Sequence, residues 1–222
     1  MFEVKNLTKR FGQQTICKDF DMTMEPGQIS LLVGPSGSGK TTILRMINGL
    51  ESADQGDIGL GIYHLRYQNA ETPPKDQAAY QREVGLVFQD YQLFPHLTVM
   101  DNLTLAPHMN RLADKPDLEA QAMSWLEKFA LSDKAQVLPE KLSGGQKQRV
   151  AIIRAMMLKP KLLCFDEPTA ALDAENSMAF ADIIKELANS GTMVLIVTHD
   201  GVLVQALEGE AQIIDASQFV GA

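Results

Sequence analysis

Residues 29–42 read ISLLVGPSGSGKTT, an apolar run followed at once by a glycine-rich loop. The loop fits the phosphate-binding pattern GxxxxGK[ST], with Gly34, Gly39, Lys40 and Thr41 at its fixed positions. Glycines let the backbone approach phosphate oxygens, and a helix expected over 42–50 would direct its amide groups and dipole at the anion. The stretch therefore predicts a strand, a phosphate-binding loop and a helix in succession.

Three further apolar runs, at 84–88, 162–165 and 193–197, resemble residues 29–33 in length and composition. Continuous apolar runs bounded by turn residues are typical of strands buried on both faces of a parallel sheet. Ligands of open parallel sheets bind outside the carboxyl ends of the strands. We therefore expect these four strands to deliver polar side chains to one site.

The middle of the chain has helical rather than strand spacing, at 99–105, 118–129 and 144–158. Prolines are expected to punctuate these helical segments, at positions 107, 116, 139 and 160. The sequence therefore predicts one domain over residues 1–222, in which residues 1–90 and 159–222 form a core lobe and residues 91–158 form a helical subdomain.

The composition narrows the possible partners. The 222 residues are 45% apolar, enough for a sizeable core, and 28 acidic against 20 basic residues leave a net charge of −8. Nucleic acid is therefore not an expected partner, and any membrane association should run through another protein. The start MFEVK resembles no leader, and no window approaches the ~20 apolar residues that span a bilayer. A cytoplasmic location follows, with Cys17 and Cys164 as reduced core residues.

A second motif, LLCFDE at 162–167, is an apolar strand that ends in two carboxylates. Asp166 would hold Mg²⁺, and Glu167 would orient or deprotonate an attacking water. Lys40 would reach the β- and γ-phosphates of ATP, and the Thr41 hydroxyl would ligate Mg²⁺. An isolated Asp-Glu pair is more often a helix cap or a solvated corner. Beside a phosphate-binding loop, catalysis is the favoured interpretation.

A third motif is LSGGQ at 142–146, before a helix stopped by Pro160. Ser143 is a natural N-cap, and the bare amides of Gly144 and Gly145 would bind an anion, although an ordinary capped helix has the same pattern. Set between the phosphate-binding loop and the Asp-Glu pair, LSGGQ resembles the signature sequence of ABC-type ATPases. The resemblance covers residues 2–199. It implies a P-loop NTPase of α/β class with a largely parallel central sheet, N-terminal antiparallel strands and an inserted α-helical subdomain.

The resemblance also implies a composite site. In that family two copies pack head to tail, and each ATP lies between one P-loop and the signature sequence of the other copy. Gln89 matches the Q-loop glutamine, Asp173 lies in the D-loop, His199 matches the switch histidine, and Phe11 falls where an aromatic ring stacks on adenine. Without the family, Phe11 could equally be a core residue. The implied nucleotide-binding residues are Phe11, Gly34, Pro35, Ser36, Gly37, Ser38, Gly39, Lys40, Thr41, Thr42, Gln89, Ser143, Gly144, Gly145, Gln146 and Asp173. The implied catalytic residues are Lys40, Glu167 and His199, and the implied Mg²⁺ ligands are Thr41, Gln89 and Asp166.

Residues 89–102, QDYQLFPHLTVMDN, look like the corresponding segment of ATPase subunits from polar amino-acid importers. In those proteins the segment faces the coupling helices of the membrane permease, so Tyr91, Leu93 and Phe94 would supply an apolar contact; the alternative is that they pack into the helical lobe. The resemblance thus implies a peripheral protein on the inner face of the membrane, which acts with a permease and, indirectly, a solute-binding protein. An exporter or lipoprotein-release ATPase, a soluble ABC ATPase acting on nucleic acid or ribosomes, and a regulatory module without turnover remain as alternatives.

Some segments depart from the family pattern. Residues 56–67 fit its usual glycine-turned hairpin poorly, and Ala170 and Ala174 replace the serine and proline common around the D-loop. The 23 residues after His199 are fewer than in relatives, with room for one strand at 211–215. A dimer contact built from the tail is therefore not expected.

Overall fold

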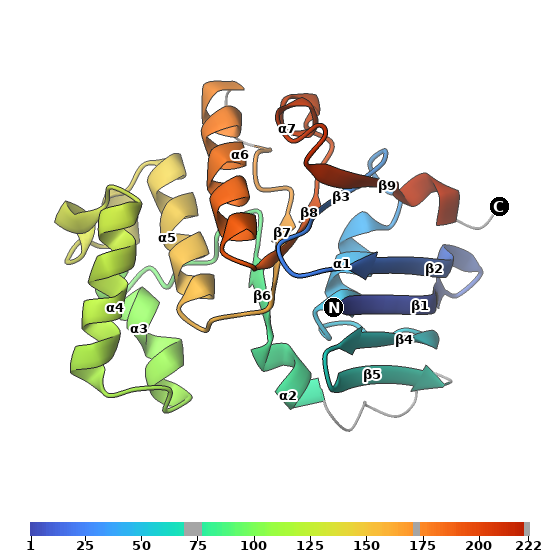
Figure 1. Cartoon of the computed structure of the whole chain (residues 1–222), viewed down its shortest axis with the longest axis horizontal. Coiled ribbons are helices and arrows are strands. Elements are labelled where there is room, and N and C mark those ends of the chain that lie inside the picture. The colour runs from blue at the N-terminus through green and yellow to red at the C-terminus, as the bar shows by residue number, and fades with distance from the viewer. Residues whose placement is uncertain (69–76, 171–173, 220–222) are drawn as a thin grey trace. The chain divides into compact units, whose positions relative to one another are not determined.

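The computed structural model describes residues 1–68, 77–170 and 174–219, which are shown in Figure 1. They form two compact units, each with its own internal packing. The first comprises Met1–Leu86 and Pro160–Ala222, and the second comprises Val87–Lys159.

Two sheets build the first unit. The antiparallel sheet has the order β2-β1-β4-β5 and consists of β1 (Phe2–Phe11), β2 (Gln14–Met24), β4 (Gln55–Leu60) and β5 (Tyr63–Gln68). The other sheet has the order β6-β7-β8-β3-β9. Its β7–β8, β8–β3 and β3–β9 pairs are parallel. Its strands are β3 (Ile29–Val33), β6 (Val84–Val87), β7 (Leu162–Asp166), β8 (Met193–Val197) and β9 (Ala211–Asp215). The predicted α/β fold, with antiparallel N-terminal strands and a largely parallel sheet, is confirmed.

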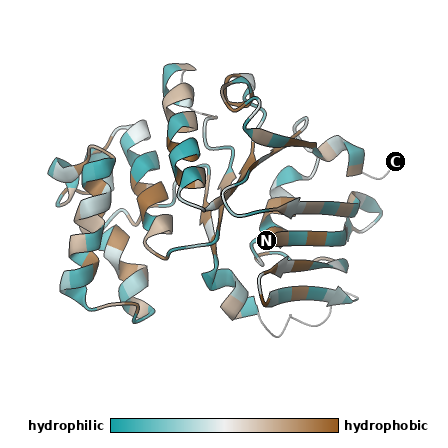
Figure 2. Cartoon of the chain, viewed as in Figure 1, coloured by the Kyte–Doolittle hydropathy of each residue, from teal (hydrophilic) through white to brown (hydrophobic). Residues whose placement is uncertain are grey.

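Helices lie against both faces of the parallel sheet. Helix α1 (Lys40–Ile47) packs on β7 and β8, whereas α6 (Ala174–Asn189) packs on β3 and β8. Side chains alternate along each strand, so one face of β7 joins the cluster around α1 while Phe165 points the other way. There the Phe165 ring meets Phe180 of α6 edge to face, with 5.3 Å between centroids. Because both faces are covered, the inner strands are mainly apolar, with Ser30 of β3 and the terminal Asp166 of β7 as exceptions, and much of their length is brown in Figure 2.

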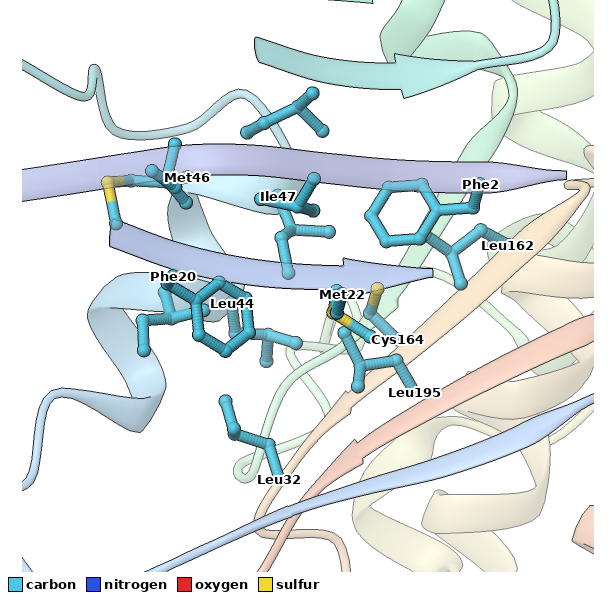
Figure 3. Packing of buried hydrophobic residues seen from close by; sticks show 14 of the residues in the cluster. Phe2, Phe20, Met22, Leu32, Leu44, Met46, Ile47, Leu162, Cys164 and Leu195 are labelled. Carbon is cyan, nitrogen blue, oxygen red and sulfur yellow. The ribbon is translucent and has the colours of Figure 1, made fainter. Parts of the chain in front are cut away.

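The core of this unit joins its two sheets through α1 (Figure 3). The antiparallel sheet contributes Phe2, Phe20 and Met22, helix α1 contributes Leu44, Met46 and Ile47, and the parallel sheet contributes Leu32, Leu162, Cys164 and Leu195. Each large apolar side chain buried in this way stabilises the fold by roughly 1.5–3 kcal/mol. Cys17 and Cys164 are both buried and free, as predicted.

Helix α2 (Gln77–Arg82) forms hydrogen bonds to the carboxyl end of α1. The buried hydroxyl of Tyr80 donates to the Ile47 carbonyl at 2.6 Å, and the side-chain amides of Gln77 and Gln81 donate to the Gly49 carbonyl at 2.7 and 2.9 Å. Gly49 has a φ of 65°, so α1 ends before the predicted limit at residue 50. The helix that follows the phosphate-binding loop is therefore held at its carboxyl end as well.

A hairpin forms where the sequence fits the family pattern poorly. Strands β4 and β5 pair from Gln55↔Gln68 to Leu60↔Tyr63, leaving a two-residue turn that begins at Gly61. Gly61 has a φ of 62°, which a tight hairpin turn requires and glycine adopts without strain. The pattern is weak in sequence because glycines and charged residues interrupt the strand. Burial of Ile58, Leu60, Leu65 and Tyr67 on one face nevertheless fixes the pairing.

The second unit is helical. It contains α3 (Val99–Met109), α4 (Lys115–Lys128), the short 3-10 helices η1 (Ser132–Lys134) and η2 (Pro139–Lys141), and α5 (Gly144–Met156), with α3 packed on α4 and α5. Pro107 was expected to interrupt a helix but lies inside the last turn of α3. So close to the end, the missing N–H removes only one helical hydrogen bond, and Asn110 N still bonds to Ala106 O. In the remaining part of the chain, α7 (Gly201–Ala206) follows β8 and η3 (Ala216–Phe219) follows β9.

Candidate functional site

The glycine-rich loop between β3 and α1 contains positions that only glycine can occupy without strain. Gly37 and Gly39 both have a φ of 81°. A Cβ at Gly39 would lie 2.7 Å from Cγ2 and 2.9 Å from the carbonyl oxygen of Ile16. The backbone of β2 is thus too close for any side chain at position 39, which explains the fixed glycine immediately before Lys40.

The loop and the start of α1 line a pocket of about 200 Å³. Its walls are Ile16, Gly37, Gly39, Lys40, Thr41 and Thr42. Ile16 was not predicted from the sequence, because an isolated apolar residue on a β-strand carries no motif. Inside the loop, the buried Ser38 hydroxyl has no hydrogen-bond partner among the described residues. A buried hydroxyl of this kind fits a loop that wraps an oxygen-rich ligand such as phosphate.

Lys40 is nearly buried, with 7% of its side chain exposed. Its ammonium group donates to the carbonyl oxygens of Gly34 and Pro35 at 2.8 and 3.0 Å, and lies 4.0 Å from Glu167 Oε1. The charge is therefore held inside the curl of the loop, where it can meet a phosphate.

Thr41 and Asp166 meet at the same edge. The Thr41 hydroxyl donates to Asp166 Oδ1 at 3.1 Å. Burial raises the pKa of Asp166, as does the charge of Glu167, while the Thr41 hydrogen bond, Arg45 and Lys40 lower it. Hydroxyl and carboxylate oxygens suit Mg²⁺, which takes one or two carboxylates and completes its shell with water and substrate phosphates. No cluster of three or more His, Cys, Asp or Glu side chains able to hold a metal occurs in residues 1–68, 77–170 and 174–219.

Glu167 and His199 come together from the ends of β7 and β8. Glu167 Oε2 lies 2.8 Å from His199 Nδ1, and the backbone N–H of His199 donates to the same oxygen at 3.3 Å. Glu167 also has a left-handed backbone with a φ of 48°, and its N–H bonds to Val197 O at 2.9 Å. The carboxylate is only 16% exposed, whereas the imidazole is 60% exposed. A mostly buried carboxylate therefore stands between a lysine and an accessible histidine.

Phe11 lies at the end of β1 and is half exposed, which excludes the alternative that it is a core residue. The Lys9 ammonium sits 4.8 Å from the centre of its ring. Lys9 itself is anchored by Glu51 Oε1 at 2.7 Å and the Ser52 carbonyl at 2.6 Å. The ring is therefore fixed in place by a cation–π contact while half of its surface stays accessible.

The remaining predicted residues lie elsewhere. Gln89 follows β6 and is exposed. At the start of α5, Ser143 Oγ accepts from Gln146 N and Gln146 Oε1 accepts from Ser143 N, forming a capping box. A Cβ at Gly144 would meet nothing within 4 Å, so this helix start is both capped and open to a ligand. Asp173 lies outside the described residues. The structure thus gathers Lys40, Thr41, Asp166, Glu167 and His199, while Gln89 and the LSGGQ segment belong to the second unit.

Asp166→Asn should stabilise the protein in the absence of Mg²⁺. A raised folded-state pKa means that the folded protein binds the proton more tightly, so ionisation destabilises the fold as pH rises through and beyond the ordinary carboxyl range. We expect the melting temperature of Asp166→Asn to exceed that of the parent by roughly 1–3 °C at pH 7 and by less near pH 4. Asp215→Asn is the matched control with the opposite sign, because hydrogen bonds from Ser217 lower the pKa of Asp215. Thermal melts of both variants would refute the assignment if Asp166→Asn melts no higher than the parent at pH 7.

Known proteins are similar to this chain over most of its length. The family described as ABC transporter matches residues 17–170. The L-cystine import ATP-binding protein TcyC of Bacillus subtilis is 39% identical over 220 residues, covering 99% of this chain and 89% of that protein. The glutamine transport ATP-binding protein GlnQ of Escherichia coli is 41% identical, covering 90% and 81%. The arginine transport ATP-binding protein ArtP of Haemophilus influenzae is 43% identical, covering 89% and 81%.

Solved structures agree with these sequence relatives. The ATP-binding cassette MJ0796, in a dimeric post-hydrolysis state bound to ADP and Pi, has a TM-score of 0.81 and 28% identity, and the match covers 98% of this chain and 95% of that one. A second dimeric structure of the same cassette has a TM-score of 0.80 and 29% identity, with the same coverage. In the described residues, every helix is too short or too polar to cross a membrane.

Proposed function

The chain belongs to the ABC transporter family, and we propose that it is the ATP-hydrolysing subunit that powers uptake of a polar amino acid through a membrane permease. The family and the ATPase activity recognised from the P-loop, LSGGQ and Asp-Glu motifs are confirmed by these relatives and by the ADP-bound structural neighbour. The observation that carries the proposal is the convergence of Lys40, Thr41, Asp166, Glu167 and His199 on the edge of one sheet.

The chemistry proposed for this edge is in-line attack of water on the γ-phosphate of ATP. Lys40 holds positive charge against the phosphates, and Glu167 orients the water or accepts its proton. His199, within hydrogen-bond distance of Glu167, keeps that carboxylate in place and contacts the γ-phosphate or the water. The Thr41 hydroxyl and the Asp166 carboxylate would hold Mg²⁺, which would neutralise part of the phosphate charge. Gln89 remains a ligand that the family resemblance implies.

The second copy of the chain is the first proposed partner. Two helix starts are suited to binding an anion, one at Lys40 and one at Ser143, yet one ATP needs only one loop. A head-to-tail dimer explains both, because residues 143–146 of one copy complete the P-loop of the other. The similar cassette MJ0796 is dimeric in both solved structures, which supports this arrangement.

A membrane permease is the second proposed partner, contacted through residues 89–102. Phe94 is 44% exposed and Tyr91 and Leu93 are partly exposed, so the segment offers apolar surface at a turn. The similar proteins are named for L-cystine, glutamine and arginine transport, which supports a polar amino acid as solute. The chain would then work on the cytoplasmic face of the membrane, with a solute-binding protein acting on the far side of the permease.

Affinity purification of the tagged chain from its own membranes tests the transport role. We expect a permease to copurify, and uptake of a labelled polar amino acid into vesicles to depend on ATP and on this chain. Recovery with an exporter or lipoprotein-release complex would replace the uptake role by one of these functions. Recovery with ribosomes or DNA would overturn the transport role altogether.

Phe11→Ala should weaken ATP binding about ten-fold, because stacking on a base contributes roughly 1–3 kcal/mol. Phe11→Tyr keeps the ring face and should bind as the parent does. Phe94→Ala removes an exposed aromatic ring from the second unit and serves as the matched control. Titration with ATP under non-hydrolysing conditions measures the effect. Equal affinities for the parent and Phe11→Ala would remove Phe11 from the adenine site.

A further inference from the structure

The loop at residues 91–98 begins with two strained residues. Tyr91 and Gln92 have φ angles of 61° and 43°, in the left-handed region. For residues other than glycine this conformation costs roughly 1–2 kcal/mol each. Two consecutive residues keep this left-handed conformation only if neighbouring groups stabilise it. The hydrogen bonds of Tyr91 and Gln92 identify those groups.

Arg154, on the last full turn of α5, holds this strained pair. One nitrogen of its guanidinium group, Nη1, donates to Gln92 O at 2.7 Å, and the other, Nη2, donates to Tyr91 O at 3.0 Å. Its Cζ also lies 6.0 Å from the centre of the Phe94 ring. Two parallel donors on a rigid plane match two successive carbonyls, a geometry that a lysine ammonium cannot reproduce.

The charge of Arg154 has no other evident use. The described residues place no carboxylate within 4.0 Å of it as an ion-pair partner. Burial lowers the pKa of Arg154, yet a guanidinium keeps its proton at any physiological pH. Because the guanidinium N–H groups of this partly buried cation donate to backbone carbonyls, Arg154 holds the backbone in place instead of forming an ion pair.

Asn102, on α3, holds the other end of the loop. Its Oδ1 accepts from Phe94 N at 2.8 Å, and its Nδ2 donates to the carbonyls of Phe94, Leu97 and Thr98 at 3.0–3.1 Å. Asn102 is 1% exposed, so these bonds are shielded from water. One buried amide therefore closes the loop around the exposed Phe94 ring.

We propose that Arg154 and Asn102 are positioning residues that keep the 91–98 loop in the form that contacts the permease, and that Arg154 ties this loop to the signature helix. The inference rests on the proposed function. Helix α5 carries the capped LSGGQ segment at its first turn and Arg154 about 16 Å further along its axis. A helix moves as one body over that length, so a displacement of the signature end on ATP binding moves the Tyr91 and Gln92 carbonyls with it.

Hydrogen exchange on the full chain tests the positioning without any partner. In Arg154→Lys and Arg154→Met, amide exchange within residues 91–98 should become roughly ten-fold faster, since one or two charge-assisted hydrogen bonds are lost. Arg149→Lys is the matched control on the same helix, because the Arg149 guanidinium bonds to the Phe129 and Gly145 carbonyls instead. It should leave the loop protected. Parent-like exchange in Arg154→Lys and Arg154→Met would overturn the proposal.

ATPase assays with and without the copurified permease in nanodiscs test the coupling. Arg154→Lys should retain permease-free turnover within about two-fold and lose most of the stimulation by the permease, roughly ten-fold. Full stimulation despite a loosened loop would overturn the coupling. A parent chain that no permease binds or stimulates would instead refute the transport role, and the exchange comparison would still decide whether Arg154 positions the loop.

Discussion

Glu167→Gln is expected to lower ATP turnover about a thousand-fold while ATP affinity stays within about two-fold of the parent, in line with the loss of a general base. Glutamine has nearly the same shape, so it can stay near His199 and Lys40, but it can no longer accept a proton. Glu167 Oε2 lies 2.8 Å from His199 Nδ1 and Oε1 lies 4.0 Å from Lys40 Nζ, so the carboxylate is already held in place. Phosphate release at saturating ATP and equilibrium binding of ATP measure the two quantities.

The same variant should accumulate a dimer in the presence of ATP and Mg²⁺, because bound ATP is no longer consumed. Size-exclusion chromatography with light scattering would detect the change in mass. Glu175→Gln, an exposed position in the first turn of α6, is the matched control and should remain at the parent rate. If Glu167→Gln hydrolyses ATP at the parent rate, the base lies elsewhere.

Lys40→Ala is expected to weaken ATP binding roughly a hundred-fold, since hydrogen bonds to charged groups contribute about 1.5–3 kcal/mol and the ammonium also neutralises phosphate charge. In the parent, 7% of the Lys40 side chain is exposed, and its ammonium group donates to the carbonyls of Gly34 and Pro35 and lies 4.0 Å from Glu167. Isothermal titration with ATP gives the affinity, and a thermal melt checks that the loop still folds.

Lys18→Ala removes an exposed lysine from β2 and controls for the change in net charge. It should bind ATP as the parent does. An unchanged affinity in Lys40→Ala would contradict the assignment of residues 34–42 as the phosphate-binding loop.

Strands were predictable where burial dominates the sequence. Ile29–Val33 and Met193–Val197 have the bounds predicted from their apolar runs, because both faces of these strands are covered by helices. The hairpin of β4 and β5 was not anticipated, since Asp57, His64 and Arg66 interrupt its apolar pattern and instead pair with one another on the exposed face. The hairpin forms because the two strands pair with each other, and the sequence of one strand alone does not reveal that pairing.

Some residues of the candidate site could be predicted from the sequence and others could not. Lys40, Thr41, Asp166 and Glu167 stand in contiguous motifs at strand ends, so topology alone predicts that they meet. Ile16, Lys9 and Arg154 have no motif, and their roles depend on contacts made far along the chain: Lys9 with Glu51, and Arg154 with Gln92. Local sequence gives no sign of such long-range partners, whereas the folded structure shows them directly.

The left-handed backbone at Glu167 makes this position vulnerable in protein engineering. Glycine or asparagine would adopt a φ of 48° with less strain than glutamate, so either substitution relieves the fold while removing the carboxylate. A library selected only for heat resistance or soluble yield would therefore enrich inactive chains at this residue. Stabilisation campaigns on the protein should keep position 167 fixed or select for turnover in every round.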